Sequence, residues 1–474
     1  MITESEIDNL GIIYTPLSFV EEILNLIPDK VFKKNLKCLD VGSGTGNFAK
    51  ILFKKIIDNI NLTQDKGEND DLFIFRKSSL ELKNITMLDI YEKHINILRD
   101  KFGKEANIIN CDFLDYKNEL FINHIRFDLI VGNPPYNIKG KIKTPTNNNI
   151  FKKNDGITIY PKFIENALDL LKENGFLCFI VPIIWLKPDK FNLYHLLTNF
   201  KILKLNILNN FESNKFFNYN CQTPTCYFLL QKTKNDFCQE KQYKILNIFD
   251  KFEKKYIEYK LYKNFPIPIH GISIVNKFIE KVKIYGTLKI IKTNLPSKKI
   301  LISNEKNENY PFKNIKSCKK KREKINDNIN ISSNSFHDNY ELVINYSNNK
   351  LIYYNIPKLI LAHKVYGIPY LDISGIYGIS SRDNYILKDY KLYELDFLKY
   401  FFESKTIMFL FSTTRYRMQY LEKYCFEFIP DIIAYCKYQN INLEKIKKKI
   451  DNFLYKEIDL TDNEIEIINN NFNQ

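Results

Sequence analysis

The sequence predicts an α/β protein whose first half is built around a mostly parallel sheet and whose second half is a separate unit. Two observations carry this prediction. Between residues 37 and 232, short apolar runs alternate with amphipathic helical patterns, which is typical of strands joined by crossover helices. The first of these runs ends in a glycine-rich turn that opens a helix, as in doubly wound domains.

Seven apolar runs are the candidate strands of a Rossmann-like domain. Each is short and bounded by polar or turn-forming residues, and successive runs are separated by a helical pattern or a turn. We expect them to form one mostly parallel, seven-stranded sheet. The runs are Cys38 to Val41, Ile85 to Asp89, Asn107 to Asn110, Phe127 to Gly132, Gly175 to Pro182, Leu203 to Leu208 and Thr225 to Gln231.

The chain is long enough for two or three domains, and its patterning changes after about residue 240. We expect a catalytic domain over residues 1–240 and a mixed α+β domain over residues 241–474. Between about residues 303 and 350, asparagine, lysine and serine dominate the sequence. This segment is predicted to be a mobile loop within the second domain.

Composition restricts the class of protein. Lysine and arginine outnumber aspartate and glutamate by 70 to 55, a net charge of +15. This excess favours a polyanionic partner, although an AT-rich genome, which inflates lysine codons, would also produce it. The cysteines form no Cys-x-x-Cys pairs, residues 1–10 lack the apolar core typical of a signal peptide, and no run approaches about 18 uninterrupted apolar residues. We expect a cytoplasmic protein with no membrane association and no metal.

The glycine-rich turn lies in Leu36 to Phe48, which reads LKCLDVGSGTGNF. Gly42, Gly44 and Gly46 permit positive backbone torsions and leave room for a nucleoside at the carboxyl end of a parallel strand. Asp40 distinguishes between cofactors. Its carboxylate would repel a pyrophosphate but can pair with the cationic amino group of a methionine moiety, which favours S-adenosyl-L-methionine over a dinucleotide.

Two further aspartates follow apolar runs. Asp89 is placed to accept hydrogen bonds from both ribose hydroxyls of the cofactor. It lies farther from the turn than the usual separation of about 20 residues, which we attribute to a polar insert; Asp70 or Asp71 could hold this role instead. Asp112 is the matching candidate for the amino group of the cofactor adenine, or else a helix cap.

The sharpest signal is FDLIVGNPPY, from Phe127 to Tyr136. Pro134 and Pro135 fix the backbone and remove two amide hydrogens, which leaves carbonyl acceptors in a rigid loop. The exocyclic amine of adenine is a suitable donor. The side-chain oxygen of Asn133 and the carbonyl of Pro134 would each accept one amine hydrogen and direct the nitrogen lone pair towards the methyl donor, while Tyr136 would stack on the base.

These motifs resemble those of gamma-type adenine-specific DNA methyltransferases of restriction-modification systems. The resemblance covers most of residues 11–232, and it implies an S-adenosylmethionine-dependent enzyme that methylates an amino group of adenine. It includes GIIYTP at 11–16, where Tyr14, Thr15 and Pro16 look like the family's N-terminal segment against the methionine end of the cofactor. By the same resemblance Asn133 is also a cofactor-binding residue.

The resemblance further implies that the target adenine flips out of double-stranded DNA into the catalytic pocket. Either Phe216 or Phe217 would pack against the flipped base, unless both phenylalanines belong to the core. The second half would be the target-recognition domain. Its candidate DNA contacts lie where cations, hydroxyls and aromatics are interleaved, although each could be a solvated surface residue: Lys364, Arg382, Arg415 and Arg417.

Other functions fit the same residues less well. An amine in RNA or an amide in a glutamine side chain would also suit the Asn133 loop, but the basic second half argues against a protein substrate. A cytosine amine usually goes with serine in place of Asn133. A DNA-binding module with an inactive cofactor site is disfavoured by intact Asp40, Gly44 and Tyr136. Any restriction endonuclease partner is expected to be a separate chain.

Overall fold

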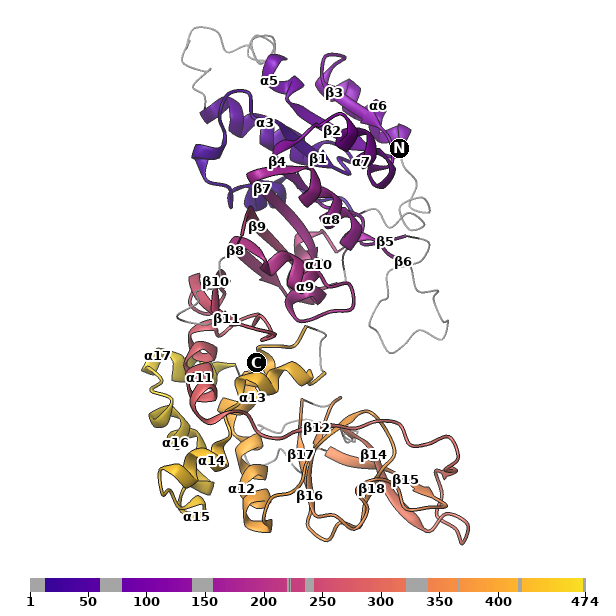
Figure 1. Cartoon of the computed structure of the whole chain (residues 1–474), viewed down its shortest axis with the longest axis vertical. Coiled ribbons are helices and arrows are strands. Elements are labelled where there is room, and N and C mark those ends of the chain that lie inside the picture. The colour runs from indigo at the N-terminus through magenta and orange to yellow at the C-terminus, as the bar shows by residue number, and fades with distance from the viewer. Residues whose placement is uncertain are drawn as a thin grey trace, which may run out of the picture. The chain divides into compact units, whose positions relative to one another are not determined.

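The computed structural model describes residues 13–59, 79–138, 157–219, 221, 223–234, 243–320, 340–364, 366–416 and 420–471. The chain divides into two compact units, residues 1–264 and 265–474 (Figure 1). The expected boundary at residue 240 was too early, because a hairpin that follows it pairs with the sheet of the first unit. No helix among the described residues is long and apolar enough to cross a membrane.

The first unit contains a nine-stranded sheet in the order β11-β10-β8-β9-β7-β4-β1-β2-β3. All seven predicted strands are present, which confirms the α/β sheet, but the predicted count omitted β10 and β11. The strands are β1 (Cys38–Val41), β2 (Ile85–Asp89), β3 (Asn107–Asn110), β4 (Phe127–Gly132), β7 (Leu171–Pro182), β8 (Phe200–Leu208), β9 (Thr225–Lys234), β10 (Tyr243–Asp250) and β11 (Lys255–Tyr262).

The strands β3, β2, β1, β4 and β7 run parallel, whereas β9 is antiparallel to both of its neighbours. A small ribbon of β5 (Asn137–Ile138) and β6 (Ile157–Thr158) follows β4. The helices of the unit are α2 (Leu17–Leu24), α3 (Asn47–Asn59), α5 (Ser79–Lys83), α6 (Glu92–Phe102), α7 (Phe113–Ile122), α8 (Tyr160–Leu170), α9 (Leu193–Thr198) and α10 (Asn210–Phe216), with short 3₁₀ turns at Asp29–Val31 and Ile183–Leu186.

Chain direction places these helices on both faces of the sheet. The chain steps outward from β1 through β2 to β3 and then returns to β4 and β7. Because parallel crossovers are right-handed, α3 and α6 lie on one face and α7 and α8 on the other. The hydrophobic core on the first face joins alternate strand residues such as Cys38, Ile85 and Leu129 to residues of α2, α3 and α6.

The strand order reverses between β1 and β4. In open α/β sheets the carboxyl ends of the strands at such a reversal enclose a crevice in which ligands bind. The glycine-rich turn follows β1, and the Asn133 loop follows β4. The topology therefore brings the two strongest sequence motifs, which are far apart in the chain, to the same edge of the sheet.

The second unit has two four-stranded sheets, β12-β19-β16-β17 and β13-β15-β14-β18. They pack through a small core that includes Ile315, Ile360 and Ile386. The strands are β12 (Ile291–Lys292), β13 (Ile302–Ser303), β14 (Phe312–Lys320), β15 (Tyr340–Ser347), β16 (Lys358–Ala362), β17 (Pro369–Asp372), β18 (Gly378–Ile379) and β19 (Asn384–Leu387).

The helices of this unit confirm its mixed α+β character. They are α11 (Ile272–Tyr285), α12 (Leu392–Glu403), α13 (Lys405–Ser412), α14 (Ile432–Tyr438), α15 (Leu443–Ile446), α16 (Ile450–Glu457) and α17 (Asp462–Asn470), with 3₁₀ turns at Lys423–Phe428 and Lys447–Lys449. The predicted loop over 303–350 is corrected, because β14 and β15 pair as antiparallel strands within it. Residues 321–339 of that segment lie outside the described residues.

Candidate active site

A cavity lies at the reversal point of the first unit's sheet. Ten of the residues predicted for the site line it: Tyr14, Thr15, Gly42, Gly44, Asp89, Asp112, Asn133, Pro134, Pro135 and Tyr136. Five others do not, namely Pro16, Asp40, Gly46, Phe216 and Phe217. The structure thus brings together the ends of β1, β2 and β4 and the N-terminal segment. The remaining five predicted residues lie elsewhere in the first unit.

The three glycines of the turn have different neighbours. All adopt positive φ angles, which glycine tolerates without strain. Gly42 and Gly44 line the cavity, and the ring of Tyr14 lies 3.7 Å from where a Cβ of Gly44 would stand. At Gly46 a Cβ would meet the Phe102 ring at 2.6 Å. Gly46 therefore makes room for α6 rather than for a nucleoside.

Asp40 lies behind the turn instead of on the cavity wall. Its side chain is fully buried, and Oδ2 accepts a hydrogen bond of 3.2 Å from the backbone N–H of Ala49, in the first turn of α3. Burial raises the pKa of Asp40 to about 7, against the lowering effects of the Ser43 side chain and the Ala49 N–H. The prediction that Asp40 faces the cofactor's amino group is corrected, because its carboxylate points towards the helix start, where backbone donors lack partners.

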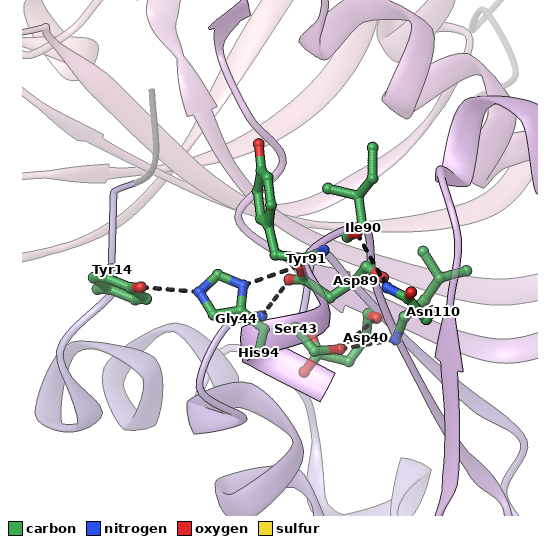
Figure 2. Close-up of polar contacts among 10 residues, drawn as sticks. Tyr14, Asp40, Ser43, Gly44, Asp89, Ile90, Tyr91, His94 and Asn110 are labelled. Carbon is green, nitrogen blue, oxygen red and sulfur yellow. Dashed lines mark hydrogen bonds and ion pairs between the residues drawn. The ribbon is translucent and has the colours of Figure 1, made fainter. Parts of the chain in front are cut away.

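Asp89 is the centre of a hydrogen-bond network on the cavity wall (Figure 2). Its Oδ2 accepts from the N–H of Gly44 at 2.8 Å, and its Oδ1 accepts from the N–H of Tyr91 at 2.9 Å. The Nδ1 of His94 lies 2.9 Å from the same Oδ1, and the Nε2 of His94 lies 2.9 Å from the Tyr14 hydroxyl. The network links the turn after β1, the end of β2 and the N-terminal segment.

Asp112 combines the two roles that the sequence left open. Its Oδ1 accepts from the N–H of Leu114 at 2.8 Å, which caps the start of α7, yet the residue also lines the cavity. Its neighbour Cys111 lines the cavity too, and burial raises the pKa of that thiol to about 12. The thiol is therefore neutral at physiological pH.

The Asn133 loop leaves β4 through a close backbone contact. Gly132 has φ +148°, and a Cβ there would lie 2.6 Å from the carbonyl oxygen of Val41 on β1. The side-chain nitrogen Nδ2 of Asn133 donates to the carbonyl of Ile13 and to Oγ1 of Thr15, both at 3.2 Å. The Oδ1 of Asn133 is buried and accepts no hydrogen bond from the described residues. The side chain is therefore held with its acceptor unpaired beside the cavity.

The N-terminal segment is attached to both loops. Besides the contacts to Asn133, the carbonyl of Thr15 accepts from the side-chain amide of Asn47 at 2.9 Å, and Asn47 begins α3. Pro16 is the N-cap residue of α2 and starts that helix rather than lining the cavity. Residues 13–15 therefore close one wall of the cavity from a distant part of the sequence.

Tyr136 lines the cavity although only 6% of it is exposed. Its ring packs edge-on against Tyr160 at a centroid distance of 6.4 Å, and its hydroxyl finds no hydrogen-bond partner among the described residues. Burial raises the pKa of the phenol well above its usual value, so the ring is uncharged. Tyr136 offers an aromatic edge or face without a charge.

The two phenylalanines proposed for base stacking lie in the core. Phe217 is fully buried, with its ring 5.4 Å from that of Phe19, and Phe216 stacks on Phe19 at 4.5 Å. Neither lines the cavity. Of the alternatives left open by the sequence, the core interpretation fits both residues. Two aromatics near them in the sequence are exposed instead: Phe211, at 74%, and Tyr219, at 73%.

The structure describes three of the four cations proposed for DNA contact, all in the second unit. Lys364 forms a 2.7 Å ion pair with Asp383, which follows the exposed Arg382 in the chain. The guanidinium of Arg415 lies 4.2 Å above the ring of Tyr366, and burial lowers its pKa to about 10. Arg417 lies outside the described residues.

Sequence reasoning missed several residues of the cavity wall. Tyr91 and His94 complete the Asp89 network, and Ile90, Phe113 and Phe163 supply apolar surface. Ile90 is 52% exposed, which is unusual for a large apolar side chain next to a buried strand. Its position directly after Asp89 was the available signal, because residues just beyond a strand's carboxyl end face the crevice.

Residues 34–217 match a family model described as Eco57I restriction-modification methylase. This range begins before β1 and ends after α10, so it includes both the glycine-rich turn and the Asn133 loop. It does not include the second unit.

Curated relatives match a similar part of the chain. A tRNA1(Val) (adenine(37)-N6)-methyltransferase of Bacteroides thetaiotaomicron is 25% identical over 146 residues, which are 31% of this chain and 52% of the relative. The Type II methyltransferase M.TthHB8I of Thermus thermophilus is 41% identical over 78 residues, 14% of this chain and 18% of the relative. The chain thus spans about half the length of the tRNA methyltransferases it matches.

Solved structures show a partial likeness. The M protein of the type I restriction enzyme EcoKI aligns with a TM-score of 0.35 and 15% identity, covering 50% of this chain and 48% of that protein. TrmN from Thermus thermophilus aligns with a TM-score of 0.26 and 14% identity, covering 46% of this chain and 49% of that protein.

Proposed function

We propose that this chain, whose residues 34–217 match restriction-modification methylases, is an adenine-specific DNA methyltransferase. It would transfer a methyl group from S-adenosyl-L-methionine to the exocyclic amine of an adenine in duplex DNA. The observation that carries the proposal is the unpaired, buried Oδ1 of Asn133 at the cavity. A buried acceptor without a partner is costly, and an amine N–H is the donor that would satisfy it.

The fold and the family match imply S-adenosyl-L-methionine as the cofactor, and the cavity residues fit it. Gly42 and Gly44 leave the backbone of the turn bare, while Asp89 and Asp112 place carboxylates at the ends of two neighbouring strands. The exposed side chain of Ile90 offers apolar surface to an adenine ring. When bound, the cofactor would supply the methyl group, and Asn133, which contacts Thr15, would lie next to its methionine end.

Asn133 is suited to orient an amine. Because its own nitrogen donates to Ile13 and Thr15, the amide cannot rotate freely, and its oxygen keeps a fixed direction. Pro134 adds a carbonyl acceptor in a loop whose prolines lack N–H groups. Two fixed acceptors can hold both amine hydrogens of an adenine and leave the nitrogen lone pair directed at the methyl group.

Methyl transfer is then mainly a matter of positioning. A group held in line for attack can gain many orders of magnitude in rate without an acid or a base. A target base must leave the duplex to reach such a cavity, at a cost of a few kcal/mol in lost stacking. The neutral ring of Tyr136 would offset part of this cost by packing against the base.

DNA is the preferred substrate, and RNA is the second candidate. The family model names restriction-modification methylases, whose substrate would be DNA, whereas curated relatives include tRNA adenine-N6 methyltransferases. Both amines present the same donors to Asn133, so the cavity does not distinguish between them. The second unit and the +15 net charge favour a long polyanion, and a restriction endonuclease acting on the same site would be a separate partner.

The test is transfer of tritiated methyl from S-adenosyl-L-methionine to unmethylated, AT-rich duplex DNA, followed by nucleoside analysis. We expect N6-methyldeoxyadenosine, and a loss of at least about 100-fold in rate for Asn133→Ala, as when a positioned transition-state hydrogen bond is removed. Asn107→Ala is the matched control, because Asn107 is an exposed asparagine that makes a side-chain bond to Thr86 away from the cavity.

Three results would contradict the proposal. Label that appears only in tRNA would move the substrate to RNA. Methylated cytosine would refute adenine specificity. An equal loss of activity in Asn133→Ala and Asn107→Ala would show that the unpaired oxygen has no part in the reaction.

A further inference from the structure

The carboxylate of Asp89 has few acceptor positions left for a ligand. A carboxylate offers about four lone-pair sites, two on each oxygen. Oδ1 already receives the N–H of Tyr91 and faces Nδ1 of His94, whereas Oδ2 receives only the N–H of Gly44. About one site remains, and it is on Oδ2. This count is at odds with a carboxylate that binds both hydroxyls of a ribose.

The imidazole of His94 is the side-chain group that contacts Oδ1 of Asp89. The residue is 2% exposed, stands at the start of α6 and uses both ring nitrogens, one towards Asp89 and the other towards the Tyr14 hydroxyl (Figure 2). The rings of Tyr14 and Tyr91 pack edge-on against it at centroid distances of 5.8 and 5.6 Å. The imidazole is therefore fixed in position and in rotation.

The contact with Tyr14 connects this network to the glycine-rich turn. The Tyr14 ring covers Gly44, whose N–H is bonded to Oδ2 of the same Asp89. Tyr14, His94, Asp89 and Gly44 thus form a closed circuit of contacts around one side of the cavity. Both partners of the imidazole, Asp89 and Tyr14, line the cavity, which a histidine that only fills the core does not require.

We propose that His94 is a positioning residue for the cofactor ribose: it occupies Oδ1 of Asp89, leaves Oδ2 to accept from a single ribose hydroxyl, and fixes Tyr14 over the glycine-rich turn. The inference rests on the proposed cofactor but not on the identity of the methylated nucleic acid. It assigns a role to a side chain outside the glycine-rich and Asn-Pro-Pro-Tyr motifs.

Binding of S-adenosylhomocysteine and of its 2′-deoxy and 3′-deoxy analogues, measured by calorimetry, tests the inference. In the unmodified chain we expect one analogue to bind about 10- to 100-fold more weakly than S-adenosylhomocysteine, because a hydrogen bond to a charged group is lost. In His94→Phe, which keeps a ring but no nitrogen, that penalty should fall to a few-fold because the carboxylate is no longer held in place. Oδ1 then becomes free, so the penalty for the other analogue should not fall.

Two conservative variants separate positioning from folding. His94→Asn keeps a donor near the place of Nδ1 and should restore part of the ribose penalty. Tyr14→Phe removes only the hydroxyl, and combined with His94→Asn it should add no further loss, since both changes break the same contact. Tyr227→Phe is the matched control: it removes a buried hydroxyl bonded to Glu22 and Asn206, away from the cavity.

The outcomes are distinct. A ribose penalty that is the same in His94→Phe as in the unmodified chain would refute the positioning role. Penalties that fall together for both analogues would show that Asp89 binds both hydroxyls. If the unmodified chain does not bind S-adenosylhomocysteine at all, the proposed function fails and this inference with it, whereas methylation of RNA instead of DNA would leave the inference intact.

Discussion

At the scale of single residues, the carboxyl group of Asp40, behind the glycine-rich turn, has an unusual environment. Its carboxylate is fully buried, one oxygen caps the start of α3, and the other has no hydrogen-bond partner among the described residues. Burial disfavours the charged form, so the pKa rises from its ordinary value of 3.8 to about 7. The side chain therefore changes charge near physiological pH.

This shift predicts a pH-dependent stability. Between pH 4 and pH 7 the folded chain keeps a proton that the unfolded chain has released, so the contribution of Asp40 to the free energy of unfolding falls as pH rises. Relative to Asp40→Asn, the unmodified chain should lose about 1.4 kcal/mol for each pH unit in this window. Urea unfolding of both chains at several pH values measures it, and parallel curves would refute the shift.

Which site residues could be predicted from sequence follows from their place in the chain. Asn133 and Asp89 could be predicted because each stands where a buried strand ends, and such ends meet at one edge of the sheet. Asp40 also stands at a strand end, but the sequence does not say towards which side its carboxylate turns. Phe217 could not be assigned because an aromatic in a short helix–loop segment suits a core as well as a pocket. His94 gave no motif at all.

At the scale of elements, the hairpin of β10 and β11 determines where the first unit ends. β10 pairs with β8 beyond the predicted boundary, and Leu246, Ile248 and Tyr259 are fully buried. The alternation of apolar and polar residues in Tyr243–Asp250 is a strand signal, but the preceding polar residues had the pattern of a linker between domains. A strand's sheet partner is set by tertiary pairing, which one segment does not reveal.

The hairpin therefore predicts the outcome of truncation. A fragment of residues 1–264 should unfold cooperatively and bind S-adenosylhomocysteine with nearly the affinity of the full chain. A fragment of residues 1–240 exposes the β8 edge and should be less stable and prone to aggregate, because open edges pair with other chains. Thermal melts and size-exclusion chromatography distinguish the two fragments, and equal stability would show that the hairpin is dispensable.

The β14–β15 pair shows the opposite limit of prediction. Most of its described side chains are partly or fully exposed. The buried ones include Ile315, Asn345 and Ser347. Its sequence is rich in lysine and asparagine, so the apolar alternation that signals a half-buried strand is weak. Backbone hydrogen bonds pair the two strands, and a prediction from composition therefore assigned this segment to a loop.

At the scale of the whole molecule, the net charge of +15 can strengthen nucleic-acid binding only through cations that are accessible to phosphates. In the second unit Arg382 is exposed, whereas Lys364 is paired with Asp383 and Arg415 is packed on Tyr366. Cation number therefore overstates the number of phosphate contacts. The three residues that the sequence treated alike have three different surroundings.

Salt dependence of DNA binding separates them. Arg382→Ala should weaken binding and reduce the slope of log affinity against log salt by about 1, as for one lost phosphate contact. Arg415→Ala should instead lower the melting temperature, because it removes a buried cation–π contact. Lys437→Ala, on α14 and paired with Glu394, is the charge-matched control. Fluorescence anisotropy at several salt concentrations measures the slopes, and equal slopes for Arg382→Ala and Lys437→Ala would contradict the assignment.

The restrained amide of Asn133 has a consequence for turnover. An adenine that already carries a methyl group has one amine hydrogen fewer, so it can satisfy either the oxygen of Asn133 or the carbonyl of Pro134, but not both. Leaving one buried acceptor unsatisfied costs about 1–3 kcal/mol, or roughly 5- to 150-fold in affinity. On the proposed function, the geometry that accepts the substrate would thus also favour release of the product and disfavour adenines that already carry a methyl group.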